Sequence, residues 1–406
     1  MKIQLLPYLK PLKGKVQLTS SKSESNRALL INALSGDKLS LDNLSAARDT
    51  QTMMRLLSNQ SDEVWDVLDA GTTMRFSTAY LATMGTGQVI TGTDRMKQRP
   101  IGLLVDALQE LGANISYVEK DGFPPLKIHK ITEQKTTQLD IPGNISSQFI
   151  SALLMIGPSL PNGIQINLTT EVFSRPYIEM TLGLMKRFGV DSQWIGDMIT
   201  IAPQAYTGGA YTIESDWSGA SYWYSMAALN TNADIILGGL REDSLQGDQE
   251  IAAIMEKLGV STEYTPEGAH LTSNGQHHDE IEINFKTCPD LAQTVMVTAA
   301  AKGTTLKMTG LESLRIKETD RIAAMAAELK KIGGSLTEPE TGLWVMTPGQ
   351  VPDTIAPIET YEDHRMAMAF APLCQLIPLT ILDPDVVNKS YPAFWDDMKL
   401  MGMEMD

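Results

Sequence analysis

The chain has little cysteine and no long apolar run, and these absences exclude several classes of protein. Its two cysteines, Cys288 and Cys374, show neither metal-binding nor disulfide spacing, so we expect two small core residues in a reducing cytoplasm. No apolar stretch is long enough to span a membrane. Pro7 and Pro11 interrupt the first residues, which therefore do not resemble a signal peptide. We expect neither a membrane anchor nor a metal site.

A net positive charge is also absent. The 33 lysines and arginines are outnumbered by 49 aspartates and glutamates, which gives a formal net charge of −16. Such a balance disfavours binding to nucleic acid or to an anionic membrane, so we expect neither. At 406 residues the chain is long enough for two or more domains, each with its own core.

The cations that are present lie beside predicted helix starts, as in "SSKSESNRALL". Ser21 and Glu24 have the spacing of a capping box, which places Lys22 in the first turn of a helix. The first turn exposes unpaired N–H groups and the positive end of the helix dipole, which attract anions. Ser23 and Arg27 are four residues apart and share a helix face. Taken alone, the stretch fits an anion site and a solvated helix cap equally well.

Similar helix starts recur six times, at about residues 21, 71, 146, 216, 290 and 363. Amphipathic segments that end at a glycine, such as "LVDALQELGANI" and "MAAELKKIGGSL", recur between them. Each repeat is therefore predicted to be helix, strand, helix, strand, strand. Six repeats indicate two domains of three, with a boundary near residue 214. The first repeat is short, with room for one strand at "VWDVLDA", and the N-terminal strand "KIQLLPYL" could pair with either half.

Two domains that face each other would bring these helix starts and their cations into one cleft. Such a cleft would attract multiply charged anions, and arginine suits carboxylate and phosphate contacts. Asp290, after Pro289, and Glu318, beside Lys317 and Arg321, could then act as proton acceptors. A helix cap and a surface ion pair explain the same two carboxylates without any chemistry.

Six motifs, in order along the whole chain, resemble the signatures of the 5-enolpyruvylshikimate-3-phosphate synthase family. They are "SKSESNRALL", "AGTTMR", "RMKQRPIG", "GNISSQF", "RIKETDR" and "DHRMAMAF". The resemblance implies an α/β (α+β) fold, a two-domain inside-out α/β barrel of six βαβαββ repeats with the first truncated. It implies domains of residues 1–19 plus 214–406 and of residues 20–213, the first strand in the C-terminal half, and the active site in the interdomain cleft.

The resemblance also implies an activity. The family, 3-phosphoshikimate 1-carboxyvinyltransferase, transfers the enolpyruvyl group of phosphoenolpyruvate to the 5-hydroxyl of shikimate 3-phosphate and releases phosphate. This step belongs to the shikimate route to chorismate and the aromatic amino acids. The family needs no cofactor and no metal, so the expected partners are the two small substrates, and we expect a monomer.

Site residues carry over motif by motif. The acid–base group implied by the resemblance is Asp290 and Glu318, with Lys22 and His364 close by. The residues implied to bind shikimate 3-phosphate are Lys22, Ser23, Arg27, Ser146, Ser147, Gln148, Ser174, Tyr177, Asp290, Ser313 and Lys317. The residues implied to bind phosphoenolpyruvate are Lys22, Gly71, Arg95, Gln148, Arg321, Arg365 and Lys389.

Three positions depart from the family's usual pattern. Ser313 stands where Asn is frequent, Asp69 replaces the Asn before "AGT", and Phe76 follows Arg75 where Pro is common. Phe76 lies about one helical turn from Gly71, so it is expected to affect the phosphoenolpyruvate pocket.

Two alternatives remain to be weighed against this reading. The enolpyruvyl transferase that acts on UDP-N-acetylglucosamine shares the fold, but it usually carries a reactive cysteine on a loop near "RP", and "TGTDRMKQRPIG" has none. The short first repeat would suit an inactive binding homologue. The intact Lys22, Asp290, Glu318 and Arg365 argue against that alternative.

Overall fold

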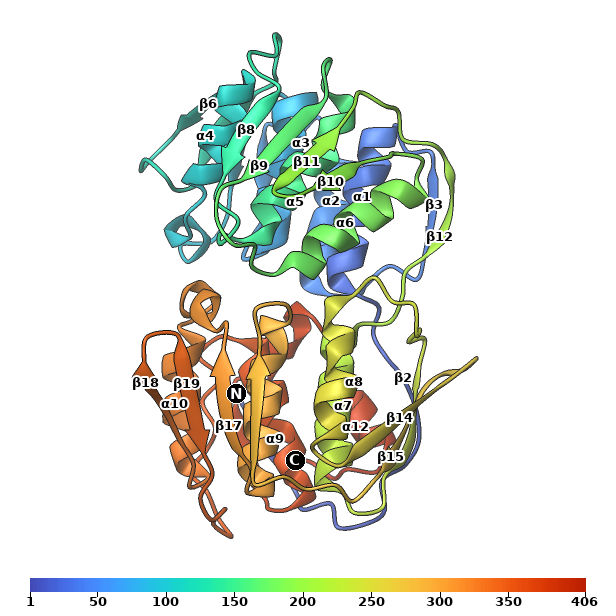
Figure 1. Ribbon diagram of the computed structural model, residues 1–406, viewed down its shortest axis with the longest axis vertical. Coiled ribbons are helices and arrows are strands. Elements are labelled where there is room, and N and C mark those ends of the chain that lie inside the picture. Colours follow the sequence, from blue (N-terminus) through green and yellow to red (C-terminus); the bar gives the residue numbers. More distant parts are fainter. The chain divides into compact units, whose positions relative to one another are not determined.

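The computed structural model describes residues 1–406, the side chain of Ile316 excepted. The chain divides into two compact units, unit 1 with Met1–Ser20 and Glu214–Asp406, and unit 2 with Ser21–Ile213 (Figure 1). In the part of the chain so described, no helix has the length and hydropathy needed to cross a membrane.

Unit 2 contains six α-helices and ten strands. The helices are α1 Lys22–Ser35, α2 Arg48–Ser58, α3 Gly71–Met84, α4 Gly102–Leu111, α5 Ser147–Ile156 and α6 Arg175–Arg187, with short 3-10 turns η1 Met96–Gln98 and η2 Gly157–Ser159. The strands are β3 Leu39–Asp42, β4 Val64–Asp66, β5 Thr86–Thr91, β6 Asn114–Tyr117, β7 Leu126–His129, β8 Gln138–Ile141, β9 Ile164–Leu168, β10 Gln193–Ile195, β11 Met198–Ile201 and β12 Gly209–Thr212. They form two four-stranded sheets, β4-β5-β7-β6 and β8-β9-β11-β10, and the pair β3-β12.

Unit 1 is built in the same way. Its helices are α7 Trp217–Leu229, α8 Ile251–Glu256, α9 Ala292–Lys302, α10 Arg321–Lys331, α11 His364–Phe370 and α12 Phe394–Leu400, with 3-10 turns η3 Gly247–Glu250, η4 Pro289–Leu291, η5 Glu312–Ile316, η6 Ala371–Gln375 and η7 Pro384–Lys389. Its strands are β1 Lys2–Leu5, β2 Lys13–Gln17, β13 Asp234–Gly238, β14 Val260–Thr265, β15 Gly268–Ser273, β16 Glu280–Asn284, β17 Thr305–Thr309, β18 Ser335–Glu340, β19 Leu343–Thr347 and β20 Leu379–Leu382. The sheets are β2-β13-β15-β14, β16-β17-β19-β18 and β1-β20.

All four four-stranded sheets share one pairing pattern. In each, the first two strands of the repeat pair in parallel, and an antiparallel hairpin completes the sheet. A parallel pair needs a crossover, and the helices between the strands supply it. This repetition confirms the predicted βαβαββ pattern.

The short first repeat has a simple structural form. Its strand β3 pairs in parallel with β12, and this sheet has only two strands. The strand predicted at "VWDVLDA" is β4, which pairs with β5 and so belongs to the sheet of the next repeat. The parallel pair of the repeat is therefore kept, and the antiparallel hairpin is what has been lost.

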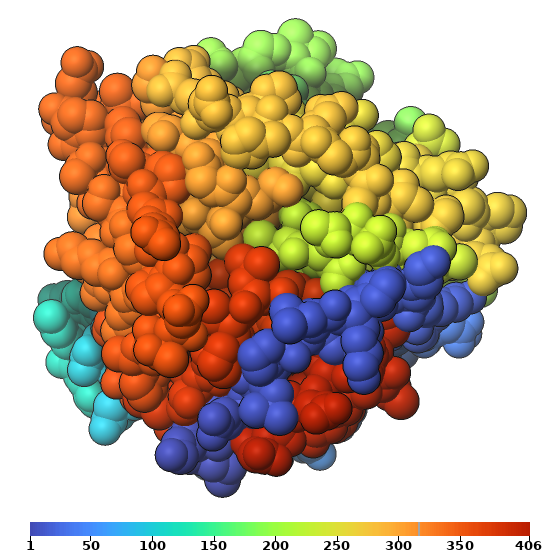
Figure 2. All heavy atoms as spheres, turned by 90° about the horizontal axis from the view of Figure 1, so that it is seen from below, coloured from blue at the N-terminus to red at the C-terminus, as the bar shows by residue number. Residues whose placement is uncertain are grey.

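The N-terminal strand belongs to unit 1, as the family resemblance implied. β1 pairs antiparallel with β20, and the backbone N–H of Gln4 donates to the carbonyl of Asp406 at 2.9 Å. Figure 2 shows the N-terminal residues, in blue, lying across the C-terminal segment, in red. The period of the sequence did not indicate this second two-stranded sheet, because its two strands come from opposite ends of the chain.

The predicted helix starts are confirmed, and side-chain caps explain four of the six, at α1, α5, α7 and α11. Ser21 accepts a hydrogen bond from the N–H of Glu24, Asp216 from that of Gly219, and Asp363 from that of Arg365. The predicted start near residue 290 is a 3-10 turn, η4, that leads into α9.

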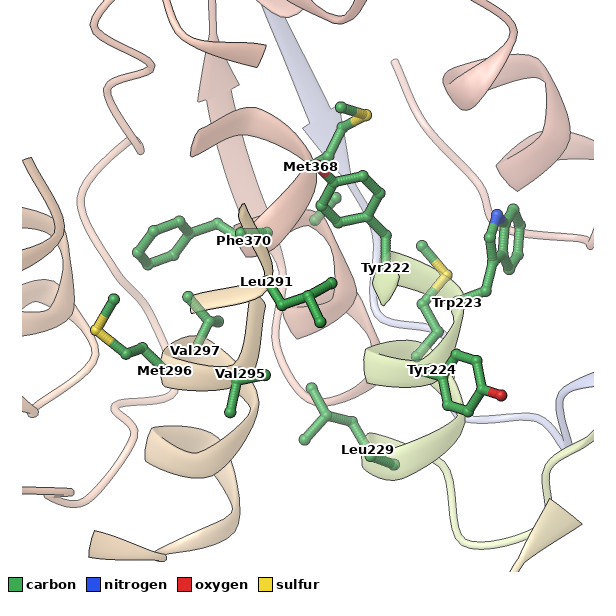
Figure 3. Close-up of a cluster of buried hydrophobic side chains, with 14 of the residues drawn as sticks. Tyr222, Trp223, Tyr224, Leu229, Leu291, Val295, Met296, Val297, Met368 and Phe370 are labelled. Atoms are coloured by element: carbon green, nitrogen blue, oxygen red, sulfur yellow. The ribbon is translucent and has the colours of Figure 1, made fainter. Parts of the chain in front are cut away.

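The helices that follow these caps are buried on nearly every side. Figure 1 shows α7 and α9 lying between the sheets of unit 1, and α7 and α9 also pack against each other. Tyr222, Trp223, Val295 and Phe370 are fully or almost fully buried there (Figure 3). A helix that is apolar around its whole circumference can only be stable in such an interior. The fold is therefore inside-out, with helices at the centre and sheets outside.

Candidate active site

An arginine at the start of α10 joins three carboxylates of unit 1. Arg321 is only 2% exposed, and its Nε donates to Oδ2 of Asp363 at 2.6 Å. Its Nη1 donates to Oδ1 of Asp290 at 3.0 Å, and its Nη2 donates to Oε2 of Glu318 at 2.9 Å. The Asp320 side chain caps this helix and so fixes where Arg321 begins it. The two carboxylates predicted to be catalytic thus converge on one guanidinium.

Further predicted residues surround the same cluster. Arg365, in the first turn of α11, donates from Nη2 to Oδ2 of Asp290 at 2.9 Å and from Nη1 to the Asp290 carbonyl at 3.0 Å. Lys317 Nζ lies 3.8 Å from Oδ1 of Asp290, and Lys389 Nζ lies 3.4 Å from Oε1 of Glu318. His364 is buried, with Nδ1 3.6 Å from Oδ1 of Asp363.

The surrounding charges decide the protonation of Asp290. Burial alone would raise its pKa, but Arg365, Lys317 and Arg321 outweigh burial and hold the pKa well below its usual range. Asp290 is therefore a carboxylate at neutral pH. In this cluster four cations surround Asp290, Glu318 and Asp363, and cations gathered in this way can bind anions.

A fourth carboxylate lies behind Arg365. Ser218, in the first turn of α7, lies 3.3 Å from Nη2 of Arg365, and its hydroxyl donates to the buried Asp248. Burial, and after it the charge of Asp290, raise the pKa of Asp248 to about 6. The sequence analysis did not select Ser218 or Asp248, because the residues around each of them look like those of an ordinary helix start.

In unit 2, Lys22 begins α1 and forms an ion pair with the buried Asp49. Lys22 Nζ lies 3.2 Å from Oδ2 of Asp49, which belongs to α2. The Glu24 carboxylate accepts a hydrogen bond from the hydroxyl of Tyr211. Ser23 follows Lys22 in the first turn and is half-buried. The predicted first-turn position of Lys22 is confirmed, and Asp49 is a partner that the sequence did not single out.

Arg27 is far more buried than its predicted role suggested, since it is only 2% exposed. Its Nε donates to Oγ1 of Thr181 at 2.7 Å, and its Nη1 donates to the Ser23 carbonyl at 2.9 Å. Its Nη2 donates to Oγ of Ser151 and to the Tyr177 carbonyl, both at 3.3 Å. Burial lowers the pKa of Arg27 to about 10. Arg27 therefore ties α1 to α5 and α6.

Two aromatic rings lie against this guanidinium. The ring centroid of Phe76 is 5.4 Å from Cζ of Arg27, and that of Tyr177 is 5.9 Å away. Phe76, the residue that replaces the usual Pro, is fully buried in α3. This replacement therefore places an aromatic ring against Arg27, and its effect on the phosphoenolpyruvate pocket stays a prediction.

Arg99, a cation that the motifs did not select, lies against the start of α3. A Cβ added at Gly71 would lie 2.6 Å from Nη1 of Arg99, so only glycine lets this guanidinium approach so closely. Arg95, the residue that the motifs selected, is exposed and lies just before η1.

Two further residues lie at the start of α3. Gln148 Nε2 donates to Oγ1 of Thr72 at 3.0 Å and so reaches this helix start. Asp69, just before it, pairs with Arg48 at 2.6 Å.

The remaining predicted residues lie at helix ends. Ser146 caps α5 through the N–H of Gln148, and Ser147 is its first residue. Ser174 precedes α6 with φ 54°, in the left-handed region, and Tyr177 lies in the first turn of that helix. Ser313 is half-buried in η5. The predicted site residues of unit 1 lie close to one another, and several of those of unit 2 do so as well. That both groups contact one ligand stays a prediction.

Among the described residues, no group of His, Cys, Asp and Glu is arranged to hold a metal ion.

Comparison with known proteins gives one consistent result. The family model described as EPSP synthase (3-phosphoshikimate 1-carboxyvinyltransferase) matches residues 8–61 and 57–398. A 3-phosphoshikimate 1-carboxyvinyltransferase of Bacteroides fragilis is 50% identical over 402 residues, covering 98% of this chain and 97% of the relative. A protein of the same name from Vibrio atlanticus is 37% identical, covering 98% and 99%.

Solved structures with a similar fold belong to EPSP synthases. An EPSP synthase structure from Acinetobacter baumannii superimposes with a TM-score of 0.81 at 22% identity, covering 100% of this chain and 99% of that one. At this identity the likeness concerns the fold alone, and it confirms the predicted two-domain α/β class. The family model and the two relatives cover nearly the whole chain, which therefore belongs to the EPSP synthase (3-phosphoshikimate 1-carboxyvinyltransferase) family.

Proposed function

We propose that this chain transfers the enolpyruvyl group of phosphoenolpyruvate to the 5-hydroxyl of shikimate 3-phosphate, with release of phosphate. It is thus a transferase of the shikimate pathway to chorismate and the aromatic amino acids. Family membership over nearly the whole chain supports this activity. The structural observation that carries it is the convergence of Asp290 and Glu318 on Arg321, beside further cations.

The reaction requires proton transfers in both its addition and its elimination step, and a site for anions. The substrate hydroxyl loses a proton as its oxygen attacks C2 of phosphoenolpyruvate, while C3 gains a proton to become a methyl group. The tetrahedral intermediate then expels phosphate as the methyl group loses a proton, which restores the double bond. Two carboxylic groups suffice for these transfers when fixed cations hold the anionic groups.

The geometry suggests different roles for the two carboxylates. Asp290 is held ionised by Arg365, Lys317 and Arg321, so in the free protein it is a weak base suited to orienting a hydroxyl. Anionic substrates that engage these cations would offset their charge and raise the pKa of Asp290. Substrate binding would thereby increase its basicity. Glu318, between Arg321 and Lys389, is placed to exchange the proton of the methyl group.

The binding roles follow the motifs. For shikimate 3-phosphate we propose Lys22, Ser23, Arg27, Ser146, Ser147, Gln148, Ser174, Tyr177, Asp290, Ser313 and Lys317. For phosphoenolpyruvate we propose Lys22, Gly71, Arg95, Gln148, Arg321, Arg365 and Lys389, and we add Arg99 because it lies against Gly71. Lys22 and His364 would assist the acid–base pair. These residues come from both units, so one shared ligand requires the units to meet around it. A monomer in the cytoplasm is proposed as well.

The test is a turnover assay that follows phosphate release. Phosphate should appear only when shikimate 3-phosphate and phosphoenolpyruvate are both present. Replacing shikimate 3-phosphate by UDP-N-acetylglucosamine should give none, which separates this activity from the related transferase. An Asp290→Asn variant purified in the same way controls for contaminating phosphatases. No phosphate release from the wild-type chain with both substrates would refute the proposal.

A further inference from the structure

The segment before α11 contains two consecutive residues in the left-handed region. Tyr361 has φ 53° and Glu362 has φ 58°, and neither is glycine. Side chains with a Cβ atom disfavour this region, so such residues persist only where neighbouring groups hold them. The next three residues are Asp363, His364 and Arg365, which begin α11 and line the candidate site. The origin of this strained turn therefore bears on the site.

A buried carboxylate of α10 holds the turn at one end. Glu328 is 1% exposed, and its Oε1 accepts a hydrogen bond from the Tyr361 hydroxyl at 2.8 Å. Its Oε2 accepts the backbone N–H of Glu359 at 3.1 Å, and Lys331 Nζ lies 2.7 Å away. Lys331 also donates to the carbonyl of Pro357 at 2.7 Å. The chain leading into the turn is thus fixed to α10 by side-chain contacts.

The same helix holds the turn at its other end. Arg321 donates to both carboxylate oxygens of Asp363, at 2.6 and 3.3 Å. Asp363 closes the turn through its backbone N–H, which donates to the Thr360 carbonyl at 2.9 Å. Its Oδ1 accepts the N–H of Arg365 at 2.9 Å. Arg321 and Glu328 are seven residues apart, about two helical turns, so one face of α10 grips the segment at two points.

We propose that Tyr361 and Glu328 are positioning residues, whose hydrogen bond holds the left-handed turn and thereby sets where the Arg365 guanidinium lies. This role rests on the proposed function of Arg365 in binding phosphoenolpyruvate. Arg365 is the second residue of α11, the helix that follows the turn. Its two contacts with Asp290 therefore depend on where α11 starts. A shift of α11 would move Arg365 relative to Asp290.

The contact is suited to positioning rather than to bulk stability. Tyr361 is 39% exposed, so its ring adds little to the core, whereas its hydroxyl reaches a buried carboxylate. Burial, and then the hydrogen bond to Glu328, raise the pKa of Tyr361 to about 12, so the hydroxyl remains a donor at neutral pH. Without that hydroxyl, Glu328 would keep its contacts with Glu359 and Lys331. A Tyr361→Phe chain should therefore fold.

The first arm of the test does not depend on any activity. Hydrogen exchange is measured on the full chain without substrate, comparing wild type with Tyr361→Phe. The amides at the start of α11, including that of Arg365, should exchange about tenfold faster in the variant, since a hydrogen bond to a charged group has been lost. The amides of α7 should be unchanged. Unchanged exchange at α11 would overturn the proposal, whatever the activity assay shows.

The second arm separates positioning from stability. Tyr361→Phe should raise the KM for phosphoenolpyruvate by about tenfold and leave the KM for shikimate 3-phosphate much less affected. Adding Glu362→Gly should restore the KM in part, because glycine adopts the left-handed region at little cost. Tyr8→Phe, which removes another tyrosine hydroxyl of unit 1, is the matched control and should change neither.

Two outcomes of this second arm count against the proposal. Wild-type kinetics in Tyr361→Phe would show that the turn does not position Arg365, and failure of Glu362→Gly to restore any of the KM would remove the role of the strained backbone. If the wild-type chain itself releases no phosphate, the proposed function fails, and the exchange arm alone decides whether the hydrogen bond holds the turn.

Discussion

The Nε of Arg321 donates to Oδ2 of Asp363 at 2.6 Å, and both side chains are buried. Because the remaining nitrogens of Arg321 face Asp290 and Glu318, one guanidinium fixes the relative positions of three carboxylates from three segments. A buried charge that loses its partner destabilises the fold, so removing any one of these four side chains should affect the positions of the others. This arrangement would therefore give the proposed proton transfers a rigid frame.

The two central carboxylates should affect turnover more than binding. Asp290→Asn and Glu318→Gln keep the shape of each side chain and remove its proton-transfer capacity. Each should lower kcat by about 10²–10⁴-fold while shikimate 3-phosphate still binds. Steady-state kinetics together with calorimetric titration would check this. Turnover close to the wild-type rate in either variant would remove that residue from the mechanism.

Arg27→Ala should weaken both the fold and the binding of shikimate 3-phosphate. The truncation removes the four hydrogen bonds that the Arg27 guanidinium donates in a buried site, which should cost about 3 kcal/mol of unfolding free energy. Arg95→Ala, which removes an exposed arginine, is the stability control. Thermal unfolding and calorimetry on both variants would test this, and an unfolding midpoint equal to that of wild type would contradict the structural role.

Gly71→Ala should displace the guanidinium of Arg99. The new Cβ would meet Nη1 at 2.6 Å, and a flexible side chain gives way more easily than backbone. We therefore expect a higher KM for phosphoenolpyruvate with an unfolding temperature close to that of wild type. Gly209→Ala, where no atom lies within 4 Å of the added Cβ and the backbone φ is not positive, separates the effect of the contact from that of losing a glycine. An unchanged KM in Gly71→Ala would show that Arg99 plays no part in binding.

Asp248 should make stability depend on pH in a defined window. Its folded pKa, about 6, lies above the value of an unfolded aspartate, so its protonated form favours folding. This stability is fully present below about pH 4 and is lost as the pH rises to about 6. Asp248→Asn cannot ionise and should gain on wild type by up to about 3 kcal/mol across that window.

The measurement for Asp248 is chemical unfolding of both proteins at about pH 4 and about pH 7. The depressed pKa of Asp290 acts in the opposite direction, but both proteins share it, so it largely cancels in the difference. A difference in unfolding free energy between the two proteins that is independent of pH would refute the prediction.

Shikimate 3-phosphate should bring the two units together. The residues proposed to bind it include Lys22 and Ser147 of unit 2 and Asp290 and Lys317 of unit 1, and only a closed arrangement lets both sets touch one ligand. Small-angle scattering should show a smaller radius of gyration when the ligand is bound. An unchanged radius in a sample shown to be saturated would count against closure.

The sequence alone determined the repeat pattern and the six helix starts. Those features depend on residues close together in the chain, such as Ser21 with the N–H of Glu24, or Gly112, which ends α4 with φ 114°. Caps, glycine stops and hydrophobic period act over one or two turns, so they can be read without knowing what the segment packs against. The motifs then identified the family, and with it the residues to look for.

Only the tertiary structure decided which of those residues touch and which partners hold them. Arg321 meets Asp363 across 42 residues, and Arg27 meets Thr181 across 154. No local pattern shows that Arg27 is buried rather than exposed. Nor does one show that Arg99, and not Arg95, contacts Gly71. The pairing of β3 with β12 and that of β1 with β20 likewise join strands distant in sequence. The physical reason is that side-chain burial and ion pairing depend on packing between elements, which the local sequence does not encode.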